Sequence, residues 1–297
     1  MLSSAKIGQS SWRYYQRTVA GGACEYYAEQ GDAPGRWHGS GLDQLGLTAG
    51  ARVEERELEA LFGCALSPTT ESALGSAWRA DAVTGFDLTF SAPKSVSTLW
   101  ALGDAGTMAV VDAAHGAAVS AALDYLQAHA SLSRRGRHGV EQIGSAGFAA
   151  ALFDHRTSRT GDLQLHTHAL VVNKVRCTDG AWRTLDGHEV YHHKKAAGVV
   201  YQAALRAELT TRLPVVFGAV SERGQAEIAG VPEALMAAWS SRTSAVMADA
   251  VPTIADAETS PRWCHGWCQT QTRLRDGGRL RRSQRWVVGR VGLEPTT

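Results

Sequence analysis

The strongest constraint on the fold comes from two candidate β-strands, residues 147–155 and 163–175, which are joined by a short polar turn. Residues i and i+2 of a strand point to the same face, so His166 and His168 project side by side. If the two strands pair antiparallel through that turn, His155 at the end of the first strand comes close to the other two histidines. The sequence therefore predicts an antiparallel sheet on which three imidazoles converge.

Three imidazoles that leave coordination positions open are typical of a catalytic metal site, because structural zinc sites are closed by four protein ligands. Imidazole binds Zn, Ni, Cu and Fe and tolerates Mn, so the ligand set alone does not select the metal. Asp87 lies on the polar face of another candidate strand and could accept the second N–H of one imidazole, which would fix its tautomer. The alternatives are surface histidines with ordinary hydrogen bonds and a solvent-facing Asp87.

The rest of the pattern indicates a mixed α+β protein. Strict alternation over residues 86–91 predicts a strand, and Pro93 opens a helix directly after it. A turn at Asp179-Gly180 predicts a third short strand with Trp182 and Leu185, so that the strands form an antiparallel meander. Helical spacing of apolar residues predicts helices over residues 54–62, 109–130, 196–213 and 232–239.

Composition excludes several classes of protein. With 297 residues and 44% hydrophobic content the chain can bury a sizeable core. No stretch approaches the ~20 apolar residues of a membrane span, and the N-terminus lacks the apolar core of a secretory signal. The five cysteines are scattered, so we interpret them as reduced thiols and expect a cytoplasmic protein without membrane insertion.

The charge is uneven along the chain. From Arg262 onward there are eight Arg and two acidic residues, a balance of +6, which leaves −5 for the 22 basic and 27 acidic residues before it. Any electrostatic binding of DNA by the residues before Arg262 must therefore come from a local patch of basic side chains. Residues 253–297 also lack helical or strand periodicity, so we expect a domain over residues 1–252 and a basic, disordered or non-native tail over 253–297.

Several motifs occur together in one order: two tyrosine doublets, then RWHGSGLDQLGL, GFDLTFSAPKSVSTLWAL, FDHRTSRTGDLQLHTHALVVN, DGAWRTLDG and YQAALRAELTTRL. Over about residues 1–250 this combination resembles the relaxase domain of the MobF (TrwC/TraI) class of conjugative relaxases, which are HUH endonucleases. The resemblance implies a two-layer α+β palm whose central antiparallel sheet carries the histidines, with helices packed on it. It also implies site- and strand-specific nicking and rejoining of single-stranded DNA at a plasmid origin of transfer.

The resemblance assigns roles position by position. It implies that His155, His166 and His168 bind one divalent metal ion, with Mg or Mn favoured by the family and Zn, Ni or Cu allowed by the ligands. Asp87 would support them. Tyr14 would be the principal nucleophile, which forms a 5′-phosphotyrosine, and Tyr26 the second; Tyr15 and Tyr27 complete the doublets. The alternative for the tyrosines is an aromatic core role.

Contacts to DNA are less well defined by the sequence. Stacking and phosphate contacts could come from aromatic and basic residues, although the tryptophans could equally be core: Trp12, Arg13, Trp37, Lys94, Arg156 and Arg159. His192 and His193, beside two lysines, suggest a polar loop or a phosphate-contacting patch.

Two departures from the family pattern stand out. Leu163 stands where the family usually has Pro, and the phosphate loop of an ATPase, G-x-x-x-x-G-K-[ST], is absent, so no ATP site is expected in this chain. A truncated transfer protein fits this pattern, with relaxosome and coupling proteins as further candidate partners. The alternatives are a rolling-circle replication initiator with the same chemistry and a non-catalytic remnant that binds single-stranded DNA.

Overall fold

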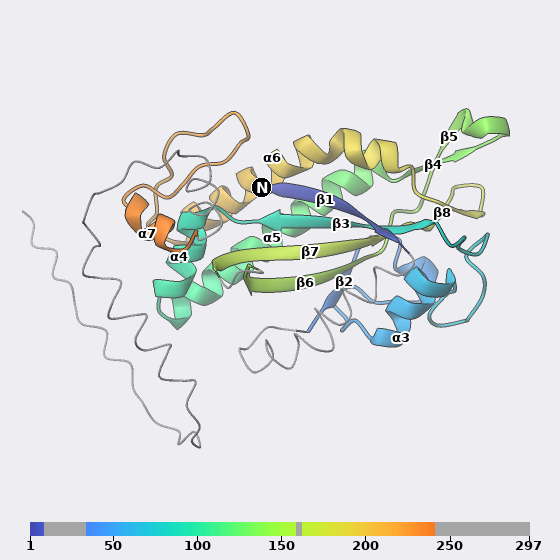
Figure 1. Ribbon diagram of the computed structural model, residues 1–297, viewed down its shortest axis with the longest axis horizontal. Helices are drawn as coiled ribbons and strands as arrows, with labels where there is room; N and C mark the ends of the chain where they lie inside the picture. The colour runs from blue at the N-terminus through green and yellow to red at the C-terminus, as the bar shows by residue number, and fades with distance from the viewer. Residues whose placement is uncertain (9–33, 159–161, 241–297) are drawn as a thin grey trace, which may run out of the picture. The chain divides into compact units, whose positions relative to one another are not determined.

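A five-stranded antiparallel sheet organises the protein (Figure 1). The computed structural model describes residues 1–8, 34–158 and 162–240. The strand order is β1-β3-β7-β6-β2. The strands are β1 (Leu2–Gly8), β3 (Val83–Ser91), β7 (Leu163–Val172), β6 (Ala150–Thr157) and β2 (Arg36–His38). All of these elements lie in one compact unit, Met1–Ala248, and the boundary expected near residue 252 lies outside the described residues.

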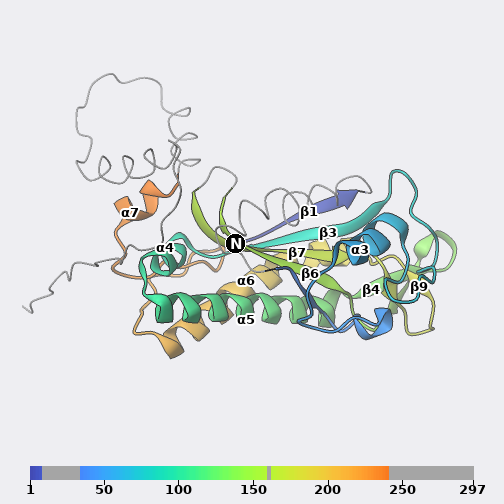
Figure 2. The same ribbon diagram turned by 90° about the horizontal axis from the view of Figure 1, so that it is seen from below.

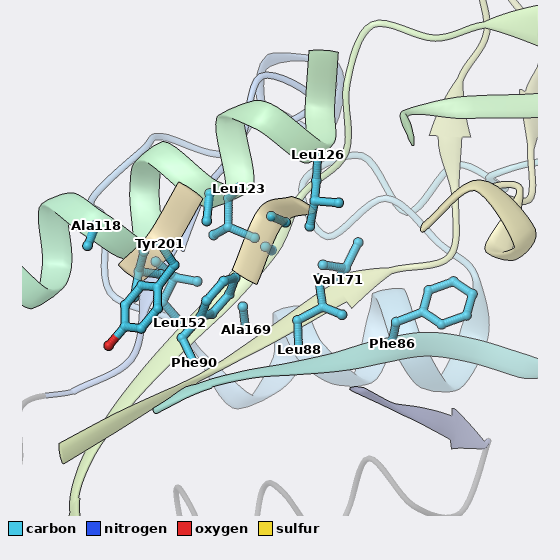
Figure 3. Packing of buried hydrophobic residues seen from close by; sticks show 14 of the residues in the cluster. Phe86, Leu88, Phe90, Ala118, Leu123, Leu126, Leu152, Ala169, Val171 and Tyr201 are labelled. Atoms are coloured by element: carbon cyan, nitrogen blue, oxygen red, sulfur yellow. The ribbon is translucent and has the colours of Figure 1, made fainter. Parts of the chain in front are cut away.

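Two long helices, α5 (Ala105–Ala130) and α6 (Gly187–Arg212), cover one face of the sheet (Figure 2). The alternation predicted over residues 86–91 directs Phe86, Leu88 and Phe90 toward these helices, as Figure 3 shows. Alanines on α5 let its backbone approach the sheet and α6 closely. Length and composition alone would allow α5 to cross a membrane, but its apolar residues pack in this core.

The opposite face of the sheet is covered over only part of its length. Helix α3 (Glu55–Leu58) continues into the π-helical turn η3 (Glu59–Cys64), and a single-turn helix η2 (Asp43–Leu45) lies nearby in sequence. These elements bury a second cluster against the ends of the strands that are remote from the histidines, with members that include Ile7, Trp37, Phe62, Leu170 and Val172. The second cluster adds a partial third layer to the predicted palm.

Smaller elements complete the described part of the chain. Strand β4 (Leu132–Arg135) pairs with β5 (Glu141–Gly144) around the single turn η4 (Arg137–Gly139). Strand β8 (Val175–Arg176) pairs with β9 (Trp182–Arg183). Helix α4 (Lys94–Leu102) follows β3, and α7 (Glu233–Ala238) is the last described helix.

The α+β class and the central antiparallel sheet are confirmed, with two corrections. The predicted third strand of a meander is β9, which pairs with β8 in a separate sheet, while β3 occupies the place beside β7. The interpretation of His192 and His193 as loop residues is wrong, because α6 begins at Gly187 and includes both. The Asp186 side chain accepts a hydrogen bond from the His188 amide and caps this earlier start.

Candidate active site

The register of β6, β7 and β3 brings the three histidines together. His155 lies directly opposite His166, and His168 lies between Phe153 on β6 and Thr89 on β3. The ring centroids are 5.3 Å apart for His155 and His166, 5.4 Å for His155 and His168, and 5.1 Å for His166 and His168. The cluster lies on the face that carries the second hydrophobic cluster, farther along the same strands.

Asp87 supports the cluster from the neighbouring strand. His168 Nδ1 donates to the two carboxylate oxygens of Asp87, at 3.0 and 2.9 Å, and Asp87 is only 4% exposed. Thr89 donates a further hydrogen bond from Oγ1 to Asp87 Oδ1 at 3.3 Å. Because Nδ1 of His168 carries the proton, Nε2 carries the lone pair that a metal ion requires.

His166 is oriented in the same way by the backbone. Its Nδ1 donates to the carbonyl oxygen of Gln164 at 2.9 Å, which places the lone pair on Nε2. Burial lowers the pKa of the His155 and His166 imidazoles to about 4, so both are neutral near pH 7. Neutral imidazoles are the form that binds metal.

The spacing of the rings suits a shared ion, although the rings do not yet converge on one point. Imidazoles that hold one ion through Nε2 at about 2.1 Å place their ring centroids about 5 Å apart. His155 and His166 stack with an interplanar angle of 22°, whereas their angles to His168 are 86° and 72°. Within the described residues, no three His, Cys, Asp or Glu side chains are arranged to hold an ion as they stand.

The structure places two of the candidate DNA-contacting residues, Trp37 and Lys94, in contacts within the protein. Trp37 as a DNA contact is wrong: it is 1% exposed in the second hydrophobic cluster, and its Nε1 donates to Glu57 Oε2 at 2.7 Å. Lys94 binds the carbonyl oxygens of Leu163 and Trp239 at 2.9 and 2.8 Å, so its ammonium holds α4 against β7 and the end of α7.

Arg156, a further candidate for DNA contact, lies on the histidine-bearing strand β6. Its guanidinium lies 5.0 Å from the centroid of the Trp100 ring and 3.5 Å from Asp112 Oδ2. The remaining candidates lie outside the described residues, so their roles stay predictions: Trp12, Arg13, Tyr14, Tyr15, Tyr26, Tyr27 and Arg159.

The segment that carries the tyrosines starts and ends on opposite edges of the sheet. Gly8 ends β1 at one edge, and Arg36 begins β2 at the other edge. The two histidine-bearing strands lie between these edges.

Sequence reasoning missed several residues next to the cluster. The Thr89 hydroxyl donates to Asp87, although nothing in the sequence singled Thr89 out. Asp154 and Thr167 alternate with the histidines and bond to each other on the helix face of the sheet. Polar residues on both faces of a buried strand are the signal that could have revealed them.

The comparisons with known proteins identify the family of the chain. Residues 8–275 match the family model described as TrwC relaxase. The chain belongs to the TrwC relaxase family. The match continues past residue 252, into the segment expected to be a tail, which lies outside the described residues.

Curated relatives extend the family assignment. The chain is 35% identical over 246 residues to the multifunctional conjugation protein TraI of Escherichia coli, and 35% identical over 232 residues to TraI of strain K12. These matches cover 76% and 72% of the chain, but the chain spans only 13% of the length of either relative.

Solved structures of family members share the fold. The conjugative relaxase TrwC in complex with OriT DNA, in a metal-bound form, is 28% identical, with a TM-score of 0.70 over 92% of this chain and 98% of that one. A copper-bound TrwC–OriT structure is 27% identical, with a TM-score of 0.68 and the same coverage of both chains. The relaxase fold is thus common to this chain and to proteins solved with DNA and with metal.

Proposed function

We propose that this chain is a metal-dependent relaxase domain that nicks and rejoins single-stranded DNA at an origin of transfer. The observation that carries the proposal is the cluster of His155, His166 and His168, backed by Asp87, in a chain of the TrwC relaxase family. Relatives named for conjugation, and structural neighbours bound to OriT DNA, favour an origin of transfer over a replication origin.

The tyrosines would carry out the transfer of the DNA strand. The Tyr14 hydroxyl would attack the scissile phosphorus, forming a 5′-phosphotyrosine as the P–O bond to the 3′ oxygen breaks and that oxygen leaves as the 3′-OH after gaining a proton. The reverse attack by the 3′-OH, or by that of an incoming strand, rejoins the DNA without ATP because the phosphodiester energy is kept in the tyrosine ester. Tyr26 would serve a second transfer.

His155, His166 and His168 would hold the metal, and Asp87 would keep His168 in the tautomer that presents Nε2. A divalent ion at this site supplies Lewis-acid polarisation of the scissile phosphate. The metal-bound and copper-bound neighbours support a metal cofactor, and the choice among Mg, Mn, Zn, Ni and Cu is part of the test. We place the protein in the cytoplasm, with relaxosome and coupling proteins as candidate partners.

A metal titration tests the site. His166→Ala combined with His168→Ala should abolish calorimetric binding of Mn²⁺ or Ni²⁺ at one site per chain, because two of three ligands are gone. The melting temperature of the metal-free variant should change little, since both positions lie on a sheet that is already paired. His138→Ala, at an exposed position in η4, is the matched control. Unchanged stoichiometry in the double variant would sink the proposed site.

A further inference from the structure

A chain of polar side chains crosses the helix face of the sheet, behind the histidine cluster; it is buried at Tyr201, His115 and Thr167 and partly exposed at Asp154 and Arg36. The Tyr201 hydroxyl on α6 lies 2.8 Å from His115 Nδ1, and His115 Nε2 on α5 lies 2.8 Å from Thr167 Oγ1. Thr167 Oγ1 donates to Asp154 Oδ1 at 2.5 Å, and Asp154 forms an ion pair with Arg36 on β2. We call these five residues the Asp154 network; Figure 3 shows Tyr201 at its helix end, among the core side chains.

The hydrogen bonds of the network all run in one direction. The Thr167 hydroxyl has a single hydrogen and gives it to Asp154, so it must accept from His115 Nε2–H. His115 Nδ1 then accepts from the Tyr201 hydroxyl. Burial lowers the pKa of His115 to about 4 and raises that of Tyr201, which keeps both groups neutral. Every donor therefore points toward the Asp154 carboxylate, and the direction of each hydrogen bond determines the direction of the next.

The two network residues on β6 and β7 are sequence neighbours of the candidate metal ligands. Thr167 stands between His166 and His168 in sequence, and Asp154 precedes His155. Asp154 and Thr167 lie opposite each other in the ladder, next to the pair formed by His155 and His166. The register of β6 against β7 shifts directly after His155. The Asp154–Thr167 bond thus holds the ladder one residue before the point where regular pairing ends.

A network of this kind is costly inside an apolar core, because each group loses water and must find a partner. His115 is 2% exposed and Thr167 is 0% exposed, among the alanines and leucines of the main hydrophobic cluster. Apolar residues could fill this volume without that cost. A slip of one residue between β6 and β7 would move the histidines to the opposite face, and directional hydrogen bonds oppose such a slip more strongly than apolar contacts do.

We infer that the Asp154 network is a positioning device for the metal ligands: it fixes β6 against β7 so that His155, His166 and His168 share one face at the spacing of one ion. This inference rests on the proposed metal site. Arg36 extends the network to β2, the strand that follows the tyrosine-bearing segment. The same hydrogen bonds therefore connect the ligand strands to an edge strand of the sheet.

Thr167→Val in the full chain tests the inference, because it removes the central hydroxyl and keeps a β-branched side chain. Calorimetric titration with Mn²⁺ and Ni²⁺ should show affinity weakened by about tenfold, the scale expected for groups that orient metal ligands. Thr167→Ser keeps the hydroxyl and should restore most of the affinity. The matched control is Thr84→Val. This substitution removes a fully buried hydroxyl from β3, on the face of the sheet that also carries Thr167, where the hydroxyl donates to the Ile7 carbonyl. Equal metal affinity in Thr167→Val and Thr84→Val would overturn the inference.

A second readout needs no metal. In metal-free protein with ¹⁵N-labelled histidine, Thr167→Val should shift or broaden the ring signals of His166 and His168, while Thr84→Val leaves them in place. Tyr201→Phe should produce the same change to a smaller degree, and it serves if Thr167→Val does not fold. Unchanged ring signals in the folded network variants would contradict the inference. If the unmodified protein binds metal but leaves DNA uncut, the proposed nicking fails while the positioning role is still decided by these signals.

Discussion

Successive residues along β7 alternate between candidate metal ligands and a buried hydrogen-bonding residue. His166 and His168 face the candidate metal site, and Thr167 between them faces the buried His115 on α5. The difference follows from the strand period of two, which sends neighbouring side chains to opposite faces. His168 and Thr167 are held by hydrogen bonds to carboxylates on the neighbouring strands, Asp87 and Asp154, and His166 is held by the Gln164 carbonyl on β7 itself. One strand therefore carries both the ligands and the contacts that hold them.

Stability should depend on pH through His115. Its pKa is about 4 in the folded protein, below the usual value near 6.5, because burial disfavours the charged form. Between these values the unfolded chain binds the extra proton, so this contribution to stability is complete above about pH 6.5 and is lost as pH falls toward 4. His115→Gln, which keeps a donor and an acceptor, should make the fall in unfolding free energy shallower by up to about 1.4 kcal/mol per pH unit.

Urea unfolding of the metal-free protein at several pH values between 7 and 4.5 measures this slope. His138→Gln controls for the substitution itself at an exposed position. Identical slopes for His115→Gln and the unmodified protein would show that His115 takes up its proton equally in both states, contrary to its burial.

The sequence predicts some of these residues and not others for physical reasons. The histidine trio and Asp87 could be predicted because strand alternation and a short turn determine their relative positions. The partner of Thr167 could not, since His115 lies 52 positions away on a helix and the helix packing is set by tertiary contacts. Trp37 was misassigned because its burial depends on η3 and the second hydrophobic cluster.

At the scale of elements, the sheet is held between two hydrophobic clusters of unequal size. Helices α5 and α6 cover one face, and η3 covers the end of the other face that is remote from the histidines. The early start of α6 was missed because its first turns are polar and rich in histidine and lysine, and the Asp186 cap, rather than apolar periodicity, marks the boundary. Periodicity identifies the part of a helix that is buried and leaves its solvent-exposed turns undefined.

The contact between β3 and η3 gives a prediction for Gly85. A Cβ at this position would lie 2.4 Å from Phe62 Cε1 and 2.6 Å from the Val171 carbonyl oxygen. The carbonyl belongs to the sheet and cannot retreat, so Gly85→Ala should lower the unfolding free energy by about 1–3 kcal/mol through overpacking. Thermal or urea unfolding measures the loss.

The control for that loss is Gly106→Ala, in the first turn of α5. Its Cβ would have Asp104 Oδ1 as nearest neighbour, at 3.5 Å, and alanine favours the helix by about 0.5–1 kcal/mol. A Gly85→Ala variant as stable as the Gly106→Ala variant would mean that η3 does not press on β3 as described.

At the scale of the whole molecule, strand order is the property that the sequence left undefined. Strands β1 and β2 are separated only by the tyrosine-bearing segment, yet they form opposite edges of the sheet. Local pattern predicts that strands exist, but their order depends on long-range pairing such as that of β1 with β3. The resemblance to the relaxases supplied the architecture that periodicity could not.

The C-terminal region gives a prediction that separates the domain from a tail. Deleting residues 276–297, which lie beyond the family match, should leave the melting temperature unchanged and weaken binding to non-specific single-stranded DNA, with a smaller salt dependence. Deleting residues 256–297 should also leave the melting temperature unchanged if the domain ends near residue 252. A large drop only in the longer deletion would assign residues 256–275 to the domain.

The covalent link between Tyr14 and DNA tests the central claim most directly. The full chain is incubated with Mn²⁺ and with sheared, denatured, 3′-labelled DNA of the replicon that encodes it, and then denatured and separated by size. We predict a labelled protein–DNA adduct whose peptide contains Tyr14, attached to the 5′ end of the downstream strand. Tyr14→Phe removes one oxygen and should abolish the adduct while the melting temperature is kept, and Tyr26→Phe should reduce strand transfer more than the first cut. Cleavage by Tyr14→Phe that leaves a free 5′-phosphate would contradict tyrosine transesterification, and binding without any adduct in the unmodified protein would identify a non-catalytic remnant.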